Sequence, residues 1–308
     1  ALAIAALAIT ALTPQKAPAQ ESPHVSVPQT IKNMYHPDRF PDIYLLTKPN
    51  CAYINAKDYE RVQKGQNPST VGHHGSPWAQ DRQIPLFFYG KGIRKSHIAG
   101  TAKLVDLAPT VAYLMGGQGP SATSGRVLHE ILTPETAHWG PKQRPKVVVL
   151  FSLDQCRRDH FGLFAPALPF IRQRIIAQGA FFTNAHLTYA QTATAVSHAT
   201  AGTGAIPALH GIIGNNITKP DGTFSLSIDD GHGPDPGHGE LSPKNILVPT
   251  LADEIDLQYG NRCHIQASSN YARAAIGIAG HGAFYKQNNP QPDRDTVFAF
   301  NAHSGLPY

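Results

Sequence analysis

The stretch of sequence that decides the fold is residues 147–154, which read VVVLFSLD. An unbroken apolar run that lacks the alternation of a half-exposed strand predicts a strand at the centre of a parallel sheet. Ligands of such sheets bind beyond the carboxyl ends of the strands, so Asp154 stands where a metal ligand is expected. The alternative, that the Asp154 carboxylate only caps the following turn, stays open.

Segments typical of strands and helices alternate on both sides of this run. Strands are predicted over 85–90, 180–183 and 264–267, and helices over 103–114, 168–178 and 248–255. We therefore predict an α/β fold with a mainly parallel sheet flanked by helices. Residues 133–145 carry three prolines and no apolar period, which predicts a linker between one segment at 29–132 and another at 146–308.

The composition excludes several classes of protein. Charged residues make up 15% of the 308-residue chain, and 27 glycines with 26 prolines exclude long helical bundles and coiled coils. The net charge is +5, but no cluster of basic residues is dense enough to follow a nucleic-acid backbone, so we expect no nucleic-acid partner. Three widely spaced cysteines indicate neither a zinc ribbon nor a disulfide framework, whereas 16 histidines make a metal site worth considering.

The beginning of the chain, residues 1–28, has the pattern of a leader. Residues 1–12 are uncharged and mostly apolar, and the small residues 17–19 follow them, as at the end of a secretory signal peptide. This predicts a periplasmic or secreted protein; a buried helix of a domain that begins upstream is an equal alternative. The run is too short to span a membrane.

A second candidate for chemistry is Thr194, within residues 189–200, YAQTATAVSHAT. A helix of small residues that begins near Thr194 would direct its free N–H groups and the positive end of its dipole toward a phosphate. A metal ion there could hold the threonine as an alkoxide. The alternative is that Thr192 or Thr194 is simply the N-cap of this helix.

Several segments of the second half resemble one enzyme family. They are LDQCRRD at 153–159, TATAVSHA at 192–199, HGIIGN at 210–215, LSPKNIL at 241–247 and RAAI at 273–276. Together they resemble the opening third of zinc alkaline phosphatases of the threonine-nucleophile type, which belong to the alkaline phosphatase superfamily. The resemblance implies that Asp154 is a ligand of one zinc, that Thr194 is the nucleophile and a ligand of the same zinc, and that Asn215 donates to a phosphoryl oxygen.

The first half resembles the closing third of the same family. The matching segments are YHPDRFPDIYLL at 35–46, HGSPWAQDRQIP at 74–85 and VDLAPT at 105–110. The resemblance implies that His74 is a ligand of a second zinc, although a His-His-Gly turn by itself is more often a surface loop. The two thirds therefore stand in inverted order, over 29–132 and 146–308.

The family's central third, which supplies the remaining zinc ligands, has no counterpart in this sequence. Two ligands of the first zinc and one of the second are present, whereas a catalytic zinc normally has three protein ligands and an open position. Three explanations stay open: the end of one domain joined to a tandem copy, a circularly permuted domain, or a joining of separated pieces. We expect two zinc ions in a complete enzyme and little activity or zinc binding from this chain alone.

One departure from the family concerns specificity. Phosphomonoesterases of the family bind the phosphate oxygens with a Lys and an Arg two residues apart, and here residues 271–273 read Tyr-Ala-Arg. The resemblance thus retains Arg273 as a phosphoryl ligand, but Tyr271 offers at most a neutral hydrogen bond in place of an ammonium charge. A phosphodiester, with one negative charge fewer, becomes a rival substrate.

The segment Asp229–Glu240 gathers carboxylates and two histidines in a loop rich in glycine and proline. Its residue types suit a metal ion, but glycines on every side would leave the ligands poorly fixed, so we interpret it as a flexible polar insertion.

The sequence therefore predicts a metal-dependent hydrolase of small phosphoric esters that reacts through a phosphothreonine on Thr194. Asn215 and Arg273 would hold the transferring group. One alternative is a phosphodiesterase or nucleotide pyrophosphatase that uses the same residues. The other is a catalytically silent fragment, which the missing zinc ligands favour.

Overall fold

The computed structural model describes residues 2–5, 25–51, 53, 55–67, 73–218, 222–229, 241–282 and 294–299, and of residues 2–5 the backbone alone. Most of the acidic, histidine-containing loop lies outside these residues. So do residues 6–24 of the expected leader, while Leu2–Ala5 forms a strand, β1. An uncharged apolar run can satisfy its backbone hydrogen bonds in a sheet as well as in a helix.

The main sheet has five strands in the order β3-β5-β2-β1-β4. Besides β1 they are β2 (Gln83–Tyr89), β3 (Ser96–Lys103), β4 (Val147–Leu150) and β5 (Ala180–His186). β3 pairs with β5 in parallel, as β1 does with β4, whereas β2 is antiparallel to both of its neighbours. Four strands thus share one direction and β2 opposes them, so the sheet is mixed where we expected a mainly parallel one.

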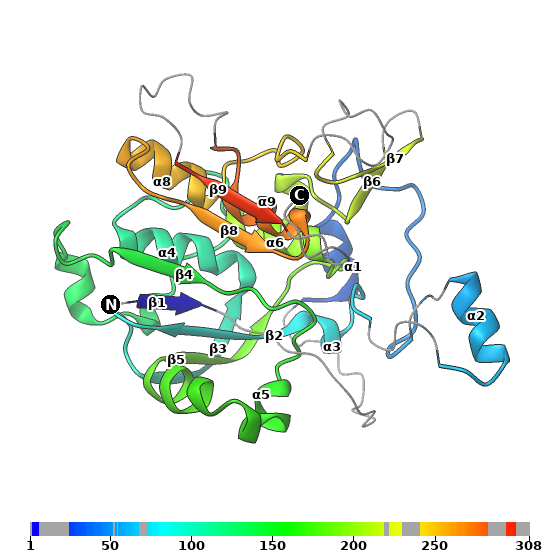
Figure 1. Cartoon of the computed structure of the whole chain (residues 1–308), viewed down its shortest axis with the longest axis horizontal. Coiled ribbons are helices and arrows are strands. Elements are labelled where there is room, and N and C mark those ends of the chain that lie inside the picture. Colours follow the sequence, from blue (N-terminus) through cyan, green and yellow to red (C-terminus); the bar gives the residue numbers. More distant parts are fainter. Residues whose placement is uncertain are drawn as a thin grey trace.

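Strands from both halves of the sequence build this sheet. β5, from the second half, lies between β3 and β2 of the first half, with Phe182 opposite Leu86 on one side and beside Ile98 on the other. Long-range pairing of this kind makes the two halves one folded unit (Figure 1).

The expected position of the 147–153 run at the centre of the sheet is wrong. β4 is an edge strand whose one partner among the described strands is β1. Val147 is 51% exposed and Phe151 41% exposed. An apolar run predicts a strand, but the pairing that decides centre or edge comes from distant residues, which the run itself does not contain.

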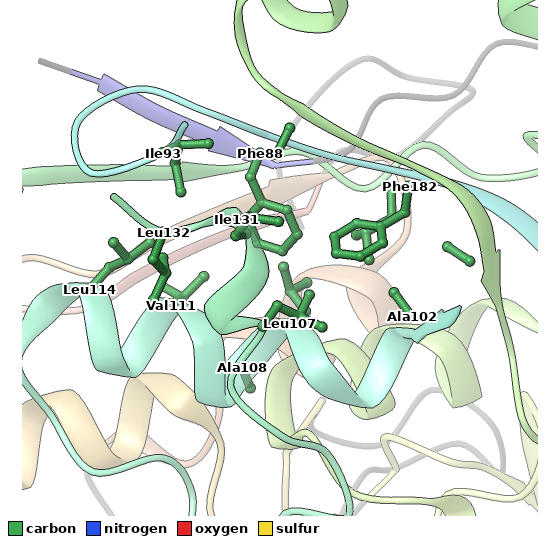
Figure 2. Close-up of a cluster of buried hydrophobic side chains, with 14 of the residues drawn as sticks. Phe88, Ile93, Ala102, Leu107, Ala108, Val111, Leu114, Ile131, Leu132 and Phe182 are labelled. Atoms are coloured by element: carbon green, nitrogen blue, oxygen red, sulfur yellow. The ribbon is translucent and has the colours of Figure 1, made fainter. Parts of the chain in front are cut away.

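Helices cover both faces of the sheet. Beneath one face a 3₁₀ turn (Leu104–Asp106) leads into α4 (Leu107–Met115), which ends at Gly116 with φ 86°, where a side chain would be strained. Figure 2 shows Phe88 of β2 and Phe182 of β5 pointing toward Leu107 of this helix. Because side chains alternate between the two faces along β2, Phe87 points to the face opposite Phe88.

On that opposite face Phe87 packs edge-to-face against Phe161, which belongs to α5 (His160–Leu163). A helical segment over 169–178 follows, with a π-helical stretch at Ile171–Ile176 that buries Ile171 and Ile175. The helix predicted over 168–178 is therefore present, and the α/β class is supported by helices on both faces of the sheet.

A second layer of helices lies beside α4. It contains α6 (Thr194–Thr203), α7 (Pro207–His210), α8 (Leu251–Tyr259) and α9 (Ala272–Ala279). α6 and α9 cross so closely that a Cβ atom on Gly202 would lie 2.2 Å from the carbonyl oxygen of Gly277. This close approach fixes the start of α9 relative to α6.

The remaining elements are short. They are α1 (Val27–Lys32), α2 (Ala56–Gln63), α3 (Ala79–Arg82), the 3₁₀ turns His129–Ile131, Pro134–His138 and Ala165–Ala167, the antiparallel pair β6 (Asn216–Thr218) and β7 (Phe224–Leu226), and the parallel pair β8 (Gln266–Ser269) and β9 (Thr296–Ala299). The 133–145 stretch buries Thr136 and packs Trp139 against the core. Within the described part of the chain, no helix combines the length and the apolar character needed to cross a membrane.

Candidate active site

The N-terminus of α6 is the centre of the candidate site. The N-cap residue is Ala193, whose side chain cannot accept a hydrogen bond, and the helix starts at Thr194, which is 4% exposed. The alternative in which Thr192 or Thr194 caps this helix is therefore wrong. The hydroxyl of Thr192 instead accepts the N–H of Gly75 at 2.9 Å, so it holds a loop of the first half of the chain.

The hydroxyl of Thr194 is held by Asp154. Thr194 Oγ1 donates to Asp154 Oδ2 at 2.9 Å, across 40 residues of sequence. Asp154 lies in the turn after β4, and its side chain keeps 42% of its surface exposed. Its carboxylate reaches the start of α6 rather than capping the turn that follows it, which favours the functional interpretation of this residue.

His74 brings the first half of the chain to the same place. Its Nε2 lies 3.5 Å from Asp154 Oδ1, and its Nδ1 lies 2.7 Å from the carbonyl oxygen of Thr192. A carbonyl only accepts, so Nδ1 carries a proton, and in a neutral ring Nε2 turns a lone pair toward the carboxylate. A second ring proton or a metal ion between Nε2 and the carboxylate would satisfy both lone pairs.

The donor set fits part of a zinc site. His74 Nε2, the Asp154 carboxylate and Thr194 Oγ1 are atoms of the types that zinc binds, and bonds of about 2.0–2.1 Å at tetrahedral angles place neighbouring donors about 3.3 Å apart. The 3.5 Å between His74 and Asp154 is close to that spacing. Among the described residues no three His, Cys, Asp or Glu side chains converge, so these residues would supply only part of the ligands of a zinc centre.

Asn215 lies on the other side of Thr194. Its Oδ1 accepts the backbone N–H of Ala195 at 2.9 Å. This bond fixes the amide, because an N–H must face the oxygen, and it leaves Nδ2 as the group able to donate. The predicted donor to a phosphoryl oxygen is thus beside the first turn of α6, one residue from the predicted nucleophile.

Arg273 is the second residue of α9. Its guanidinium carbon lies 4.4 Å from the centre of the Tyr271 ring, and its Nε is buried without a hydrogen-bond partner. Tyr271 is 49% exposed and contacts the arginine with the face of its ring. The sequence had suggested only a single neutral hydrogen bond from this residue. The structure brings Asp154, Thr194 and His74 together, while within the described part of the chain no hydrogen bond or ion pair joins Arg273 to them.

His198 lies close enough to Arg273, His74 and Asp154 for their charges to act on it, and its role was not predicted. It is 8% exposed and its Nδ1 lies 2.7 Å from the carbonyl oxygen of Thr194, one turn earlier in α6. Burial lowers the pKa of His198, and the positive charges of Arg273 and His74 lower it further against the opposing effects of the Thr194 carbonyl and Asp154. The neutral ring therefore donates to that carbonyl and braces the start of the helix. The His four residues after Thr194 in sequence is the signal that could have revealed it.

A cavity of about 350 Å³ adjoins Asn215. It is lined by Met34, Arg39, Phe40, Pro41, Tyr44, Gln191, Ile213, Gly214, Asn215, Asn216, Thr218 and Phe224. Both halves of the chain contribute to it. Sequence analysis did not anticipate it, because its walls come from segments that lie far apart along the chain.

Part of the chain is similar in sequence to known phosphoester hydrolases. Residues 148–266 match the sequence family described as type I phosphodiesterase / nucleotide pyrophosphatase. The chain is 35% identical over 146 residues to the alkaline phosphatase PhoV of Synechococcus elongatus, an alignment that covers 46% of this chain and 26% of PhoV. It is 30% identical over 162 residues to the alkaline phosphatase PafA of Elizabethkingia meningoseptica, covering 46% and 28% of the two chains.

A third relative, a protein of Myroides odoratus named calcium-transporting ATPase, is 31% identical over 143 residues, covering 44% of this chain and 24% of its own. No solved structure is significantly similar to this chain. The chain spans about a quarter of the length of these curated relatives. The matched family region contains Asp154, Thr194 and Asn215, so this part of the chain is similar to phosphoester-hydrolysing enzymes of the alkaline phosphatase and phosphodiesterase kind.

Proposed function

We propose that this protein is a hydrolase of small phosphoric esters that uses Thr194 as its nucleophile. The observation that carries the proposal is the start of α6, where the Thr194 hydroxyl caps nothing and is held by the Asp154 carboxylate beside His74. Hydroxyl groups react with phosphorus when a neighbouring base or metal activates them and when the developing charge meets a positive environment.

In the first step Thr194 Oγ1 attacks the phosphorus atom. The bond between Oγ1 and phosphorus forms while the bond to the leaving oxygen breaks, which gives a phosphothreonine. The hydroxyl proton passes to Asp154 Oδ2, which already accepts its hydrogen bond, and from there through water to the leaving oxygen, so that the carboxylate is ionised again. In the second step the oxygen of a water molecule attacks phosphorus and the bond between phosphorus and Oγ1 breaks. One proton of that water passes to Oγ1, which restores the Thr194 hydroxyl, and the phosphate product leaves.

Asn215 and Arg273 would hold the phosphoryl oxygens during both steps. Asn215 Nδ2 is free to donate because its oxygen is bound to the backbone of Ala195. Arg273 presents a charged group whose buried Nε lacks a partner. Their contribution is position and charge rather than covalent chemistry.

We further propose zinc as the metal, with two ions in a complete enzyme. His74, Asp154 and Thr194 would hold one side of that centre. When bound, zinc supplies positive charge that favours the deprotonated hydroxyl and the departing oxygen.

A phosphodiester is the second candidate substrate, and Tyr271 is the observation that favours it. The residue two positions before Arg273 contributes an aromatic ring and no charge. A doubly charged monoester would lose more from that missing charge than a singly charged diester would.

The test compares zinc-dependent hydrolysis by the wild type, Thr194→Val and Thr194→Ser. Substrates are 4-nitrophenyl phosphate and bis(4-nitrophenyl) phosphate, assayed with zinc and after chelation. The valine keeps the shape of threonine without its hydroxyl, so we expect its rate to fall to that of buffer, while the serine keeps a measurable part. Because the donor set for zinc is incomplete, the rates of the variants are compared with each other rather than with a fast enzyme. Equal rates for the wild type and Thr194→Val on both substrates would overturn the proposal and favour a catalytically silent chain.

A further inference from the structure

The cavity next to Asn215 is built from both halves of the chain and adjoins the proposed reaction centre. Asn215 belongs to both, because it lines the cavity and binds the N–H of Ala195 beside Thr194. Gln191 extends this continuity, since it lines the cavity one residue before the carbonyl that holds His74. A ligand whose phosphoryl group lies at Thr194 can therefore extend into this cavity.

Two polar side chains of the cavity, Gln191 and Asn215, have a hydrogen-bonded oxygen and an N–H group that is able to donate. The hydroxyl of Tyr44 donates to Gln191 Oε1 at 2.7 Å, and burial, with a smaller effect of Tyr53, raises the pKa of Tyr44 to about 12, so this hydroxyl stays protonated. Gln191 Oε1 is thus occupied and its Nε2 remains to donate. Asn215 is in the same state, with its oxygen bound to Ala195 and its Nδ2 left over.

Arg39 adds a positive charge to these donors. Its Nη1 donates to the carbonyl oxygens of Gly211 at 2.8 Å and Asn245 at 2.6 Å, and no carboxylate of the described residues forms an ion pair with it. Burial lowers the pKa of Arg39, and the nearby charge of Asp38 offsets this only in part. No acidic side chain is among the described residues that line the cavity. A half-buried cation whose burial is offset only in part, and which lies beside amide donors, is a site that gains from an anion.

We propose that this cavity binds a second anionic group of the substrate, a phosphate or a carboxylate, next to the phosphoryl group that is transferred. The proposal rests on the proposed function for the location of that phosphoryl group. Arg39 supplies the charge, and the Nε2 of Gln191 and the Nδ2 of Asn215 supply neutral donors. Phe40, whose ring stacks on Tyr44 with 5.7 Å between centroids, gives the cavity an apolar wall on one side.

Binding of non-hydrolysable ligands tests this proposal without any turnover. The ligands are methylenediphosphonate and phosphonoacetate, which carry a second phosphonate or a carboxylate, and ethylphosphonate, which carries neither. Titration calorimetry is done in metal-free buffer with a chelator, because diphosphonates themselves bind divalent cations. We expect the wild type to bind at least one of the two-anion ligands at least about tenfold more tightly than ethylphosphonate.

Arg39→Gln should lower the affinity for the tighter-binding two-anion ligand by at least about tenfold and change the affinity for ethylphosphonate less than about threefold. Arg174→Gln is the matched control, since it removes the same charge from an exposed arginine of the π-helical stretch and should change nothing. Gln191→Glu is a second test that leaves the contacts of Arg39 to the backbone in place, and it should also weaken the two-anion ligand selectively. Circular dichroism checks the fold of each variant.

Which two-anion ligand binds more tightly distinguishes a phosphate from a carboxylate as the preferred second group. The proposal is overturned if neither two-anion ligand binds more tightly than ethylphosphonate, or if Arg39→Gln weakens all three ligands equally. These outcomes are separate from those of the Thr194 variants, because no bond of these ligands is hydrolysed. Selective binding with an active Thr194→Val would retain the anion site and remove the nucleophile assignment.

Discussion

The starts of α6 and α8 carry the same three residue types, Thr, Asp and His, in two different roles. At α8, Thr250 is the N-cap and its hydroxyl accepts the N–H of Asp253 at 3.2 Å, while the Asp253 carboxylate accepts the N–H of Thr250 at 2.7 Å. His281 joins them with its Nδ1 at 2.8 Å from Asp253 Oδ2. At α6, Thr194 lies beyond an alanine N-cap, and its aspartate and histidine partners come from distant parts of the chain.

The difference lies in how far each cluster is satisfied. The Asp253 side chain is 1% exposed, and its two oxygens receive four hydrogen bonds. The Asp154 side chain is 42% exposed, and its histidine partner is 3.5 Å away, too far for a good hydrogen bond. A Thr-Asp-His cluster whose hydrogen bonds are complete stabilises a helix, whereas one with open positions and access to solvent can bind a ligand or a metal ion.

Exchanging each aspartate for asparagine should separate the two roles most strongly. Asp154→Asn removes a ligand charge and the acceptor of the Thr194 proton, so zinc-dependent hydrolysis should fall about a hundredfold or more with little change in stability. Asp253→Asn leaves His281 without its carboxylate, and the free energy of unfolding should fall by about 3 kcal/mol or more. Urea titrations and initial rates measure both effects. A large loss of stability in Asp154→Asn would contradict the assignment of this cluster to function.

Adding charge at the open site tests its specificity. In a complete enzyme, Tyr271→Lys should raise the ratio of monoesterase to diesterase kcat/KM at least about tenfold, because a charge-assisted hydrogen bond is worth about 1.5–3 kcal/mol and a monoester carries more negative charge. The pair of nitrophenyl substrates measures the ratio, and Tyr271→Phe is the control that keeps the ring beneath Arg273. A flat or lower ratio would remove both Tyr271 and Arg273 from the phosphoryl site.

The cluster of Thr250, Asp253 and His281 at the start of α8 should lose stability, and not activity, when its cap is removed. Thr250→Val removes the hydroxyl that accepts from Asp253, which should lower the free energy of unfolding by about 1 kcal/mol. The rate of hydrolysis per folded molecule should stay the same, since this hydroxyl is buried in the cap. A fall in rate without a fall in stability would mean that the two helix starts are not distinct in role.

Two buried histidines should give opposite dependences of stability on pH. Burial alone would lower the pKa of His281, but the Asp253 carboxylate and the Ile246 carbonyl raise it above its ordinary value. Its stabilising contribution is full below about pH 6.5 and is lost as the pH rises through the raised pKa. Burial lowers the pKa of His210 to about 3, so its contribution is full above about pH 6.5 and is lost progressively as the pH falls toward 3.

Urea titrations of His281→Asn and His210→Asn across this pH range measure these contributions as differences from the wild type. The difference for His281→Asn should shrink as the pH rises above about 6.5, and that for His210→Asn should shrink as it falls below that value. Differences that stay constant with pH would show that neither histidine changes its pKa on folding.

Local patterns predicted much of this fold. The strand and glycine at 85–90 became β2, and the helix expected near Thr194 begins at that residue. The helix expected over 248–255 begins three residues later, because Thr250 caps it with Asp253. These features depend on neighbours within a few residues, which is the range that a sequence pattern contains.

Features that depend on distant pairing were missed. β4 is an edge strand and β2 opposes the rest of the sheet, and neither follows from the apolar runs that predict the strands themselves. The proximity of Asp154 and Thr194 was anticipated through family resemblance, not through spacing, whereas the resemblance assigned His74 to a second zinc. Arg39 and Gln191 carried no local signal, because their significance comes from the cavity that two separate segments enclose.

The most direct test of the central claim is to locate a transferred phosphoryl group. The chain is mixed with zinc and 4-nitrophenyl phosphate, or its diester, quenched in acid within the first turnover, digested, and sequenced by tandem mass spectrometry. Thr250 serves as an internal control, because it is a threonine at a helix start with the same neighbouring residue types. We predict a substrate-derived phosphoryl adduct on Thr194 that is absent from Thr250 and from the Thr194→Val variant. An adduct on another residue, or hydrolysis with no adduct on Thr194 at any quench time, would contradict the account.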